Sequence, residues 1–342
     1  MDTEFHYWMT GIVARRAGFE EAEARVIAYA AEYVDANDMS LVVVDRRNGT
    51  KYRNFISQTM NILRPKQEIM RIYPIFHFVP GQPDAVSARR RDGKMHLLNC
   101  TPDNEYANAF MDAAFDASEY TRLYRIGIAS HAYADTWAHQ NFVGWHDSFN
   151  AIGTESEFSI GHMDAGHLPD WPGCVWHDPR LVEPEVDNTE RMMAACRALF
   201  GKFCAYLAGK GRGDRHGDWP ALEAELREAV GPRFRAEEHP ENPHRERRLE
   251  RYRRMAPWLP EFDERTWFDE AIRTRVRGLP DSHNGLMHLL TVFQDEYFFR
   301  GDRVPETTRW YRFQEAVKEH ERFGIRLLSP LFRTMGFELA SV

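Results

Sequence analysis

The chain has 342 residues, 43% of them hydrophobic, so it is long enough to bury a large core. Its formal net charge of −8 argues against a general nucleic-acid-binding protein, because phosphate contacts need clustered Lys and Arg. The four cysteines form no CxxC pair, which argues against a thiolate zinc site, and no apolar stretch reaches the ~20 residues of a membrane span.

The first part of the chain predicts two helices. Apolar residues recur at helical spacing from Phe5 to Ala17, before Gly18, and again over residues 20–33. The sequence Asp35-Ala-Asn-Asp38 then supplies turn residues that end the second helix.

A β-rich segment is expected next. Residues 41–44 are mostly β-branched, Asn48-Gly49 is a strong hairpin signal, and residues 51–58 provide a return strand. Residues 69–79 are a third candidate strand. We therefore expect a small β-hairpin insertion near residues 41–79, followed by a polar loop.

From Asp103 onward the pattern is mainly helical, with a long helix from about Ser118 to Asn141. Residues 142–187 show no clear period, and a structured loop of that length is usually functional. Later helices are predicted over residues 188–210, 219–230, 243–255, 264–276, 283–299 and 306–328. These patterns predict a mainly α fold.

The strongest chemical signal is a histidine–aspartate stripe in the long helix. His131, Asp135 and His139 are spaced i, i+4 and i+8, which puts them on one helix face. Imidazole and carboxylate groups are zinc ligands, and an Asp between two His can bridge two ions. Alternatively, the histidines are structural and Asp135 orients them by hydrogen bonds. We favour metal ligation because burying three polar groups is costly unless something satisfies them.

Other ligand-type residues lie elsewhere in the chain, and each alone also fits a structural role. They are His6, Asp35 and His77 and, in the glycine-hinged loop over residues 161–170, His162, Asp164 and His167.

This ordered set resembles the superfamily of zinc-dependent phospholipases C and single-strand nucleases. The segment from His131 through Asp135 and His139 to Asn141-Phe142 looks like the central helix of that superfamily. One departure is that three residues separate Asp135 from His139, where the family usually has five.

The flanking residues follow the family's order as well. An early-helix His, an Asp after the next helix and a His-Phe dipeptide correspond to His6, Asp35 and His77. The family's phospholipases also use a free N-terminal residue as a ligand, for which Glu4 or Asp2 is a substitute here. The first residues look more like those of an uncharacterised intracellular bacterial branch.

The resemblance implies a phospholipase C/nuclease-like helical bundle holding two or three zinc ions, with iron or manganese as alternatives. The implied ligand sets are Asp35, His77, His131 and Asp135 for one ion; Asp135, His139, His162 and Asp164 or His167 for a second; and His6 for a third. Asp35 would double as the catalytic general base. We expect one domain, residues 1–342, in which a metal-binding part (1–180) packs against helices over 187–342.

These observations predict a metal-dependent hydrolase, either a phosphodiesterase or a phosphomonoesterase. It would act on a small phosphorylated substrate through a metal-activated water, without a stable nucleic-acid complex. One alternative is a helical di-iron or mixed-metal oxidative enzyme. Another is a non-catalytic, metal-stabilised helical protein. Because no secretory signal is recognisable, a cytoplasmic location is expected.

Overall fold

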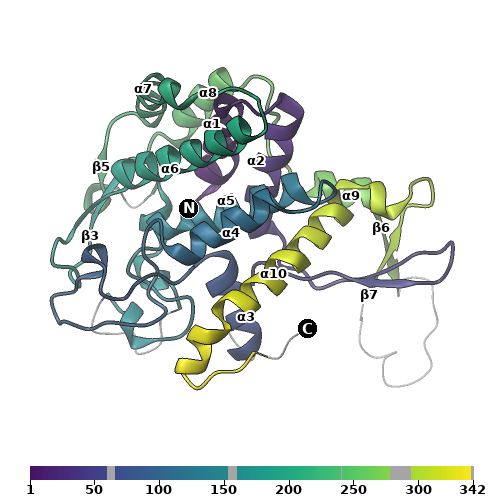
Figure 1. Ribbon diagram of the computed structural model, residues 1–342, viewed down its shortest axis with the longest axis horizontal. Coiled ribbons are helices and arrows are strands. Elements are labelled where there is room, and N and C mark those ends of the chain that lie inside the picture. The colour runs from purple at the N-terminus through teal and green to yellow at the C-terminus, as the bar shows by residue number, and fades with distance from the viewer. Residues whose placement is uncertain (60–65, 153–159, 240, 278–293, 340–342) are drawn as a thin grey trace.

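The computed structural model describes residues 1–59, 66–152, 160–239, 241–277 and 294–339. It is mainly helical, which confirms the predicted fold class (Figure 1). The phospholipase C-like arrangement of the helices stays a prediction.

The first predicted helix begins as a π-helix and continues as an α-helix. The π-helix is η1 (Glu4–Met9) and the α-helix is α1 (Thr10–Ala17). Gly18, at φ 117°, ends α1 in the left-handed conformation that glycine adopts without strain. Helix α2 (Glu21–Ala36) follows, and its first turn is closed by a capping box between Glu20 and Glu23.

The predicted hairpin is present, but the third predicted strand is wrong. Strands β1 (Val42–Val44) and β2 (Lys51–Arg53) pair antiparallel. The segment at 69–79 instead belongs mainly to helix α3 (Lys66–Phe76). The apolar positions Ile69, Ile72 and Phe76 recur at helical spacing and are buried, and that periodicity outweighs their β propensity.

Helix α5 (Arg122–Ala138) is the central element of the fold. Every residue from Tyr124 to Ala138 is buried, because α2, α4 (Glu105–Phe115) and two later helices pack around it (Figure 1). The helix ends three residues before the predicted boundary at Asn141, so His139 is its C-cap residue.

Three short strands, two between α5 and α6 (Asn188–Gly209) and one after α7 (Trp219–Val230), were not predicted from the sequence. Strands β3 (Cys174–His177), β4 (Glu185–Asp187) and β5 (Phe234–Arg235) form a sheet of order β4-β3-β5. Residues of this sheet join a small hydrophobic cluster that includes Phe142, Ala165 and Trp176. This cluster anchors the loop that carries His162.

The later helices follow most of the predictions. They are α6 (Asn188–Gly209), α7 (Trp219–Val230), α8 (Arg245–Met255), α9 (Arg265–Ala271) and α10 (Arg309–Thr334). Helices α6 and α10 both pack on α5. The short 3₁₀ turns are Val86–Ala88, Ser148–Asn150, Met163–Ala165, Leu168–Asp170, His216–Asp218, Ala236–Glu238 and Pro305–Thr307.

Two predicted helices are wrong in part. The segment at 264–276 leaves the helical conformation after Ala271 and becomes β6 (Ile272–Arg277). The end of the segment at 283–299 is a strand, β7 (Gln294–Phe299), and residues 278–293 lie outside the described residues. β6 pairs with β7, and β7 pairs with β1, so the backbone hydrogen-bonding groups of these strands are satisfied. Because the paired residues are far apart in the sequence, local sequence patterns do not predict these strands.

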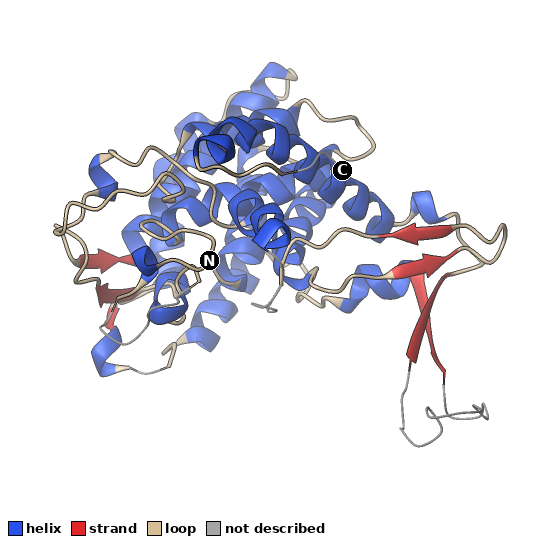
Figure 2. Ribbon diagram, turned by 90° about the horizontal axis from the view of Figure 1, so that it is seen from below, coloured by secondary structure: helices blue, strands red, loops and turns tan. Residues whose placement is uncertain are grey.

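The four-stranded sheet has the order β2-β1-β7-β6 and lies on the opposite side of the helical body from the β3 sheet (Figures 1 and 2). Figure 2 shows β6 and β7 extending away from the helices. The main hydrophobic core draws residues from both halves of the chain, from Met1 to Leu339. Within the described residues, no helix combines the length and the apolar character that crossing a membrane requires.

Candidate metal centre

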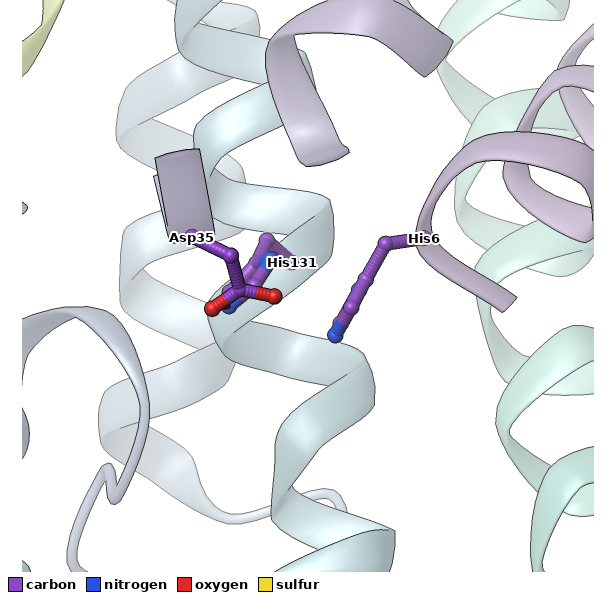
Figure 3. A group of neighbouring side chains, drawn as sticks. All are labelled: His6, Asp35 and His131. Atoms are coloured by element: carbon purple, nitrogen blue, oxygen red, sulfur yellow. Dashed lines mark ion pairs between the residues drawn. The ribbon is translucent and has the colours of Figure 1, made fainter. Parts of the chain in front are cut away.

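Close packing of α2 against α5 brings Asp35 to His131. A Cβ added to Gly127 of α5 would lie 2.5 Å from the backbone oxygen of Ile27 and 2.6 Å from the Cβ of Ala30. Only a glycine permits this approach of the two backbones. Figure 3 shows His6 and Asp35 pointing toward His131 from separate elements, and ligand atoms of these three residues lie within 4.8 Å of one another.

The carboxylate of Asp135 is the hub of the cluster. Its Oδ2 lies 3.2 Å from His131 Nε2, 3.4 Å from His77 Nδ1 and 3.5 Å from His139 Nδ1. Its Oδ1 lies 3.1 Å from His6 Nε2. Asp135 is 1% exposed, so these contacts are shielded from bulk solvent.

Backbone carbonyls orient the histidine rings. His131 Nδ1 lies 2.8 Å from the Ala31 oxygen, and His77 Nε2 lies 2.8 Å from the Ser57 oxygen. A ring nitrogen beside a carbonyl oxygen must donate its hydrogen, so the other nitrogen of a neutral ring carries a lone pair. His131 Nε2 and His77 Nδ1, which are 3.0 Å apart, are these other nitrogens. Two lone pairs therefore face each other beside Asp135, an arrangement that requires a proton or a metal cation between them.

Several buried atoms of the cluster have no hydrogen-bond partner. They include both ring nitrogens of His6, Oδ2 of Asp135 and Oδ1 of Asp170. Buried polar groups without partners are rare in folded proteins and call for an explanation such as a bound ion. The donor set, imidazole nitrogen with carboxylate oxygen, is the set that zinc, iron and manganese accept. The residues present thus fit a metal cluster.

A second ligand group is formed by His139, His162 and Asp170. His139 Nδ1 lies 2.7 Å from the His77 oxygen, so its free Nε2 faces Asp170, at 3.8 Å from Oδ1. His162 Nδ1 lies 2.8 Å from the Gly166 oxygen, and its Nε2 is 3.6 Å from Asp170 Oδ2. His139 therefore points its free nitrogen at Asp170, and not at Asp135 as the sequence predicted.

Asp170 is the acidic partner in place of Asp164 or His167. Asp164 is exposed in a 3₁₀ turn, and it joins none of the possible ligand groups among the described residues. His167 lines the rim of the cavity but is also exposed and outside these groups. The next turn, Leu168–Asp170, directs Asp170 inward, because Asn188 of α6 donates hydrogen bonds to the Leu168 and Trp171 oxygens.

The amino group of Met1 is a further member of the cluster. Its nitrogen lies 2.5 Å from Asp135 Oδ1 and 3.4 Å from Asp170 Oδ1. Burial opposes a charge on this amine, but Asp135 and Asp170 outweigh burial and raise its pKa to about 11. Glu4, the suggested substitute ligand, instead pairs with Arg248. Asp2 lines the cavity.

Electrostatics favour the ligating protonation states of Asp135, His6 and His139. Burial alone would raise the pKa of Asp135, but His139, the Met1 amine and His131 hold it well below its usual value. Burial and the neighbouring His131 lower the pKa of His6 to about 3. Burial also lowers the pKa of His139. Burial lowers the pKa of His77 too, but its hydrogen bond to Asp135 and the charge of Asp35 raise that pKa above its usual value. An ionised Asp135 and neutral histidines are the forms that bind cations.

A cavity of about 520 Å³ opens onto both ligand groups. Asp35, whose side chain is 35% exposed, lies at its wall with His77 and His139. Glu32 also lines it, with one buried carboxylate oxygen that has no hydrogen-bond partner. The described residues that line this cavity include no Lys or Arg.

Comparison with known families matches residues 1–328 of the chain to the family described as "Family of unknown function (DUF6765)". No curated protein and no solved structure matches the chain.

Proposed function

Since the chain belongs to the DUF6765 family, whose function is unknown, we propose from the site alone that it is a metal-dependent hydrolase of phosphoester bonds. The observation that carries the proposal is the pair of facing lone pairs on His77 and His131, beside the unpartnered Oδ2 of Asp135. A cation at this position would satisfy all three atoms.

The residues divide into metal-binding sets by proximity. Asp35, His77, His131 and Asp135 would hold one ion, and His139, His162 and Asp170 a second. His6 and the second oxygen of Asp135 would contribute to a third. When bound, ions of the zinc type lower the pKa of a coordinated water toward ~7 and neutralise phosphate charge.

The cavity supports an enzyme over a closed structural metal site. Asp35 is partly exposed at the cavity wall, so its carboxylate can accept a proton from a water that attacks the substrate. With no Lys or Arg among the described lining residues, phosphate charge would have to be balanced by the metal ions. A small phosphodiester or phosphomonoester suits the volume of the cavity, and the resemblance to the phospholipase C and nuclease superfamily supports the phosphoester assignment.

The test combines metal analysis with a hydrolysis assay. Protein stripped with a chelator is reloaded with zinc, iron or manganese and then assayed with bis(p-nitrophenyl) phosphate and p-nitrophenyl phosphate. We expect at least two ions per chain and hydrolysis of one substrate. His131→Ala should abolish hydrolysis, whereas His216→Ala, at an exposed histidine outside the cavity, should not. Full metal loading without hydrolysis of either compound would refute the enzymatic proposal, and binding of less than one ion would refute the metal centre.

A further inference from the structure

A buried ion pair connects the N-terminal π-helix to the C-terminal half of the chain. Glu4 is 0% exposed and Arg248 of α8 is 1% exposed. Arg248 Nε donates to Glu4 Oε2 at 2.8 Å, and Nη2 donates to Oε1 at 3.0 Å. A bidentate ion pair of this kind fixes the orientation of both groups as well as their separation.

The other donors of Arg248 are also engaged. Nη1 donates to the Pro243 oxygen at 2.8 Å, and Nη2 contacts the side-chain oxygen of Asn242. The guanidinium is therefore held in place by Asn242 and Pro243, just before α8, and its orientation toward the Glu4 carboxylate is fixed. Replacing a buried ion pair by apolar residues is often neutral or stabilising, so stability alone does not account for this one.

The π-helix transmits the position of Glu4 to His6. Residues two apart on a helix point to different sides, so Glu4 faces α8 while His6 faces α5. η1 is thus held between Arg248 on one side and Asp135 on the other. π-Helical turns are rare and occur often at functional sites.

We propose that the Glu4–Arg248 pair is a positioning device that sets the metal affinity of the site to which His6 contributes. The inference rests on the proposed metal centre, and it assigns a role to the C-terminal helices. Arg248 touches no metal-binding atom. It fixes the rotation of η1, so that Nε2 of His6, which has no hydrogen-bond partner, faces the Asp135 carboxylate.

The test measures zinc affinity by competition with a chelating dye and needs no substrate. Partners that orient a ligand typically change metal affinity by about 10–100-fold. We therefore expect Arg248→Met to weaken one zinc, the same one that His6→Ala weakens, by about that factor and to leave the other sites unchanged. Arg248→Lys should not restore the zinc affinity, because the lysine ammonium cannot form the bidentate pair with the Glu4 carboxylate.

Two comparisons separate positioning from a general loss of stability. Arg227→Met breaks a bidentate ion pair with Glu190 that joins α7 to α6 away from η1. This variant should bind every zinc with wild-type affinity. In a His6→Ala background, Arg248→Met should cause no further loss of zinc affinity, since the two residues act through one site. If Arg248→Met fails to fold, Glu4→Gln/Arg248→Met, which removes both buried charges, replaces it.

The outcomes are distinct. Wild-type zinc affinities in folded Arg248→Met, additive losses in the double variant with His6→Ala, or no effect of His6→Ala would each overturn the inference. Wild-type protein that binds no zinc would overturn the proposed function itself.

Discussion

Backbone carbonyls orient four of the site histidines, and this arrangement determines which ring nitrogens are free. One ring nitrogen of each histidine is hydrogen-bonded to a backbone carbonyl oxygen, and the four carbonyls belong to Ala31, Ser57, His77 and Gly166. The remaining nitrogens all face carboxylates. Outer contacts of this type fix the tautomer and ring orientation of metal-binding histidines.

The choice of acidic ligand in the 161–170 loop can be tested with matched substitutions. Asp170→Asn should weaken one zinc by at least about tenfold, because the carboxylate facing His139 and His162 is lost. Asp164→Asn is the same substitution in the same loop and should leave every zinc affinity unchanged. The reverse pattern, measured by dye competition, would restore the assignment predicted from the sequence.

The proposed role of Asp35 as general base predicts a kinetic defect. Loss of a general base typically slows the chemical step by about 10²–10⁴-fold, so Asp35→Asn should lower kcat by that amount. Asp38→Asn, at an exposed position beyond the end of α2, is the control and should retain activity. Unchanged kcat in zinc-loaded Asp35→Asn would exclude this role.

At the scale of elements, the contact between α2 and α5 determines the distance from Asp35 to His131. That distance is 3.7 Å between Oδ1 and Nε2, and it depends on the missing side chain of Gly127. A helix that ends at the site can deliver a ligand only if its axis is held close to α5.

Gly127→Ala should therefore separate the two helices. The added Cβ would meet the backbone of Ile27, so we expect a loss of about 1–3 kcal/mol in the free energy of unfolding and weaker zinc binding. Gly201→Ala on α6 is the control, because nothing lies within 4 Å of its added Cβ. It should raise stability by roughly 0.5–1 kcal/mol. Denaturant unfolding measures both, and equal effects of the two substitutions would contradict this account of the contact.

At the scale of the whole molecule, the candidate centre joins distant parts of the chain. Its residues come from η1, α2, α5 and the loops after α3 and α5, and Arg248 of α8 supports η1. A bound ion would therefore stabilise the entire fold and not one local element.

Removing metal should consequently lower the melting temperature. A ligand at 100 times its Kd adds about 2.7 kcal/mol to the free energy of unfolding, so we expect a drop of several degrees when a chelator is added. Asp135→Asn, which removes the charge at the hub, should show a smaller drop, because the ligand group of His139, His162 and Asp170 remains. A wild-type melting temperature insensitive to chelator would contradict this prediction.

The sequence by itself determined the mainly helical class, the hairpin after α2 and those candidate ligands that share one face of a single helix. Helical spacing put His131 and Asp135 on one face, and the hairpin dipeptide Asn48-Gly49 marked the turn between β1 and β2, because both are local effects of backbone geometry. The predictions of metal binding, phosphoester hydrolysis, a single domain and a cytoplasmic location stay predictions.

Only the tertiary structure decided the rest. The sequence analysis singled out Asp164 or His167 and missed Asp170, because only the contacts of their loop with α6 and the β3 sheet direct Asp170 inward. Likewise, β6 and β7 are strands because they pair with each other and β7 pairs with distant β1, a contact that no local pattern encodes. Long-range packing also decides which nitrogen of each histidine is free, and therefore where a cation can bind.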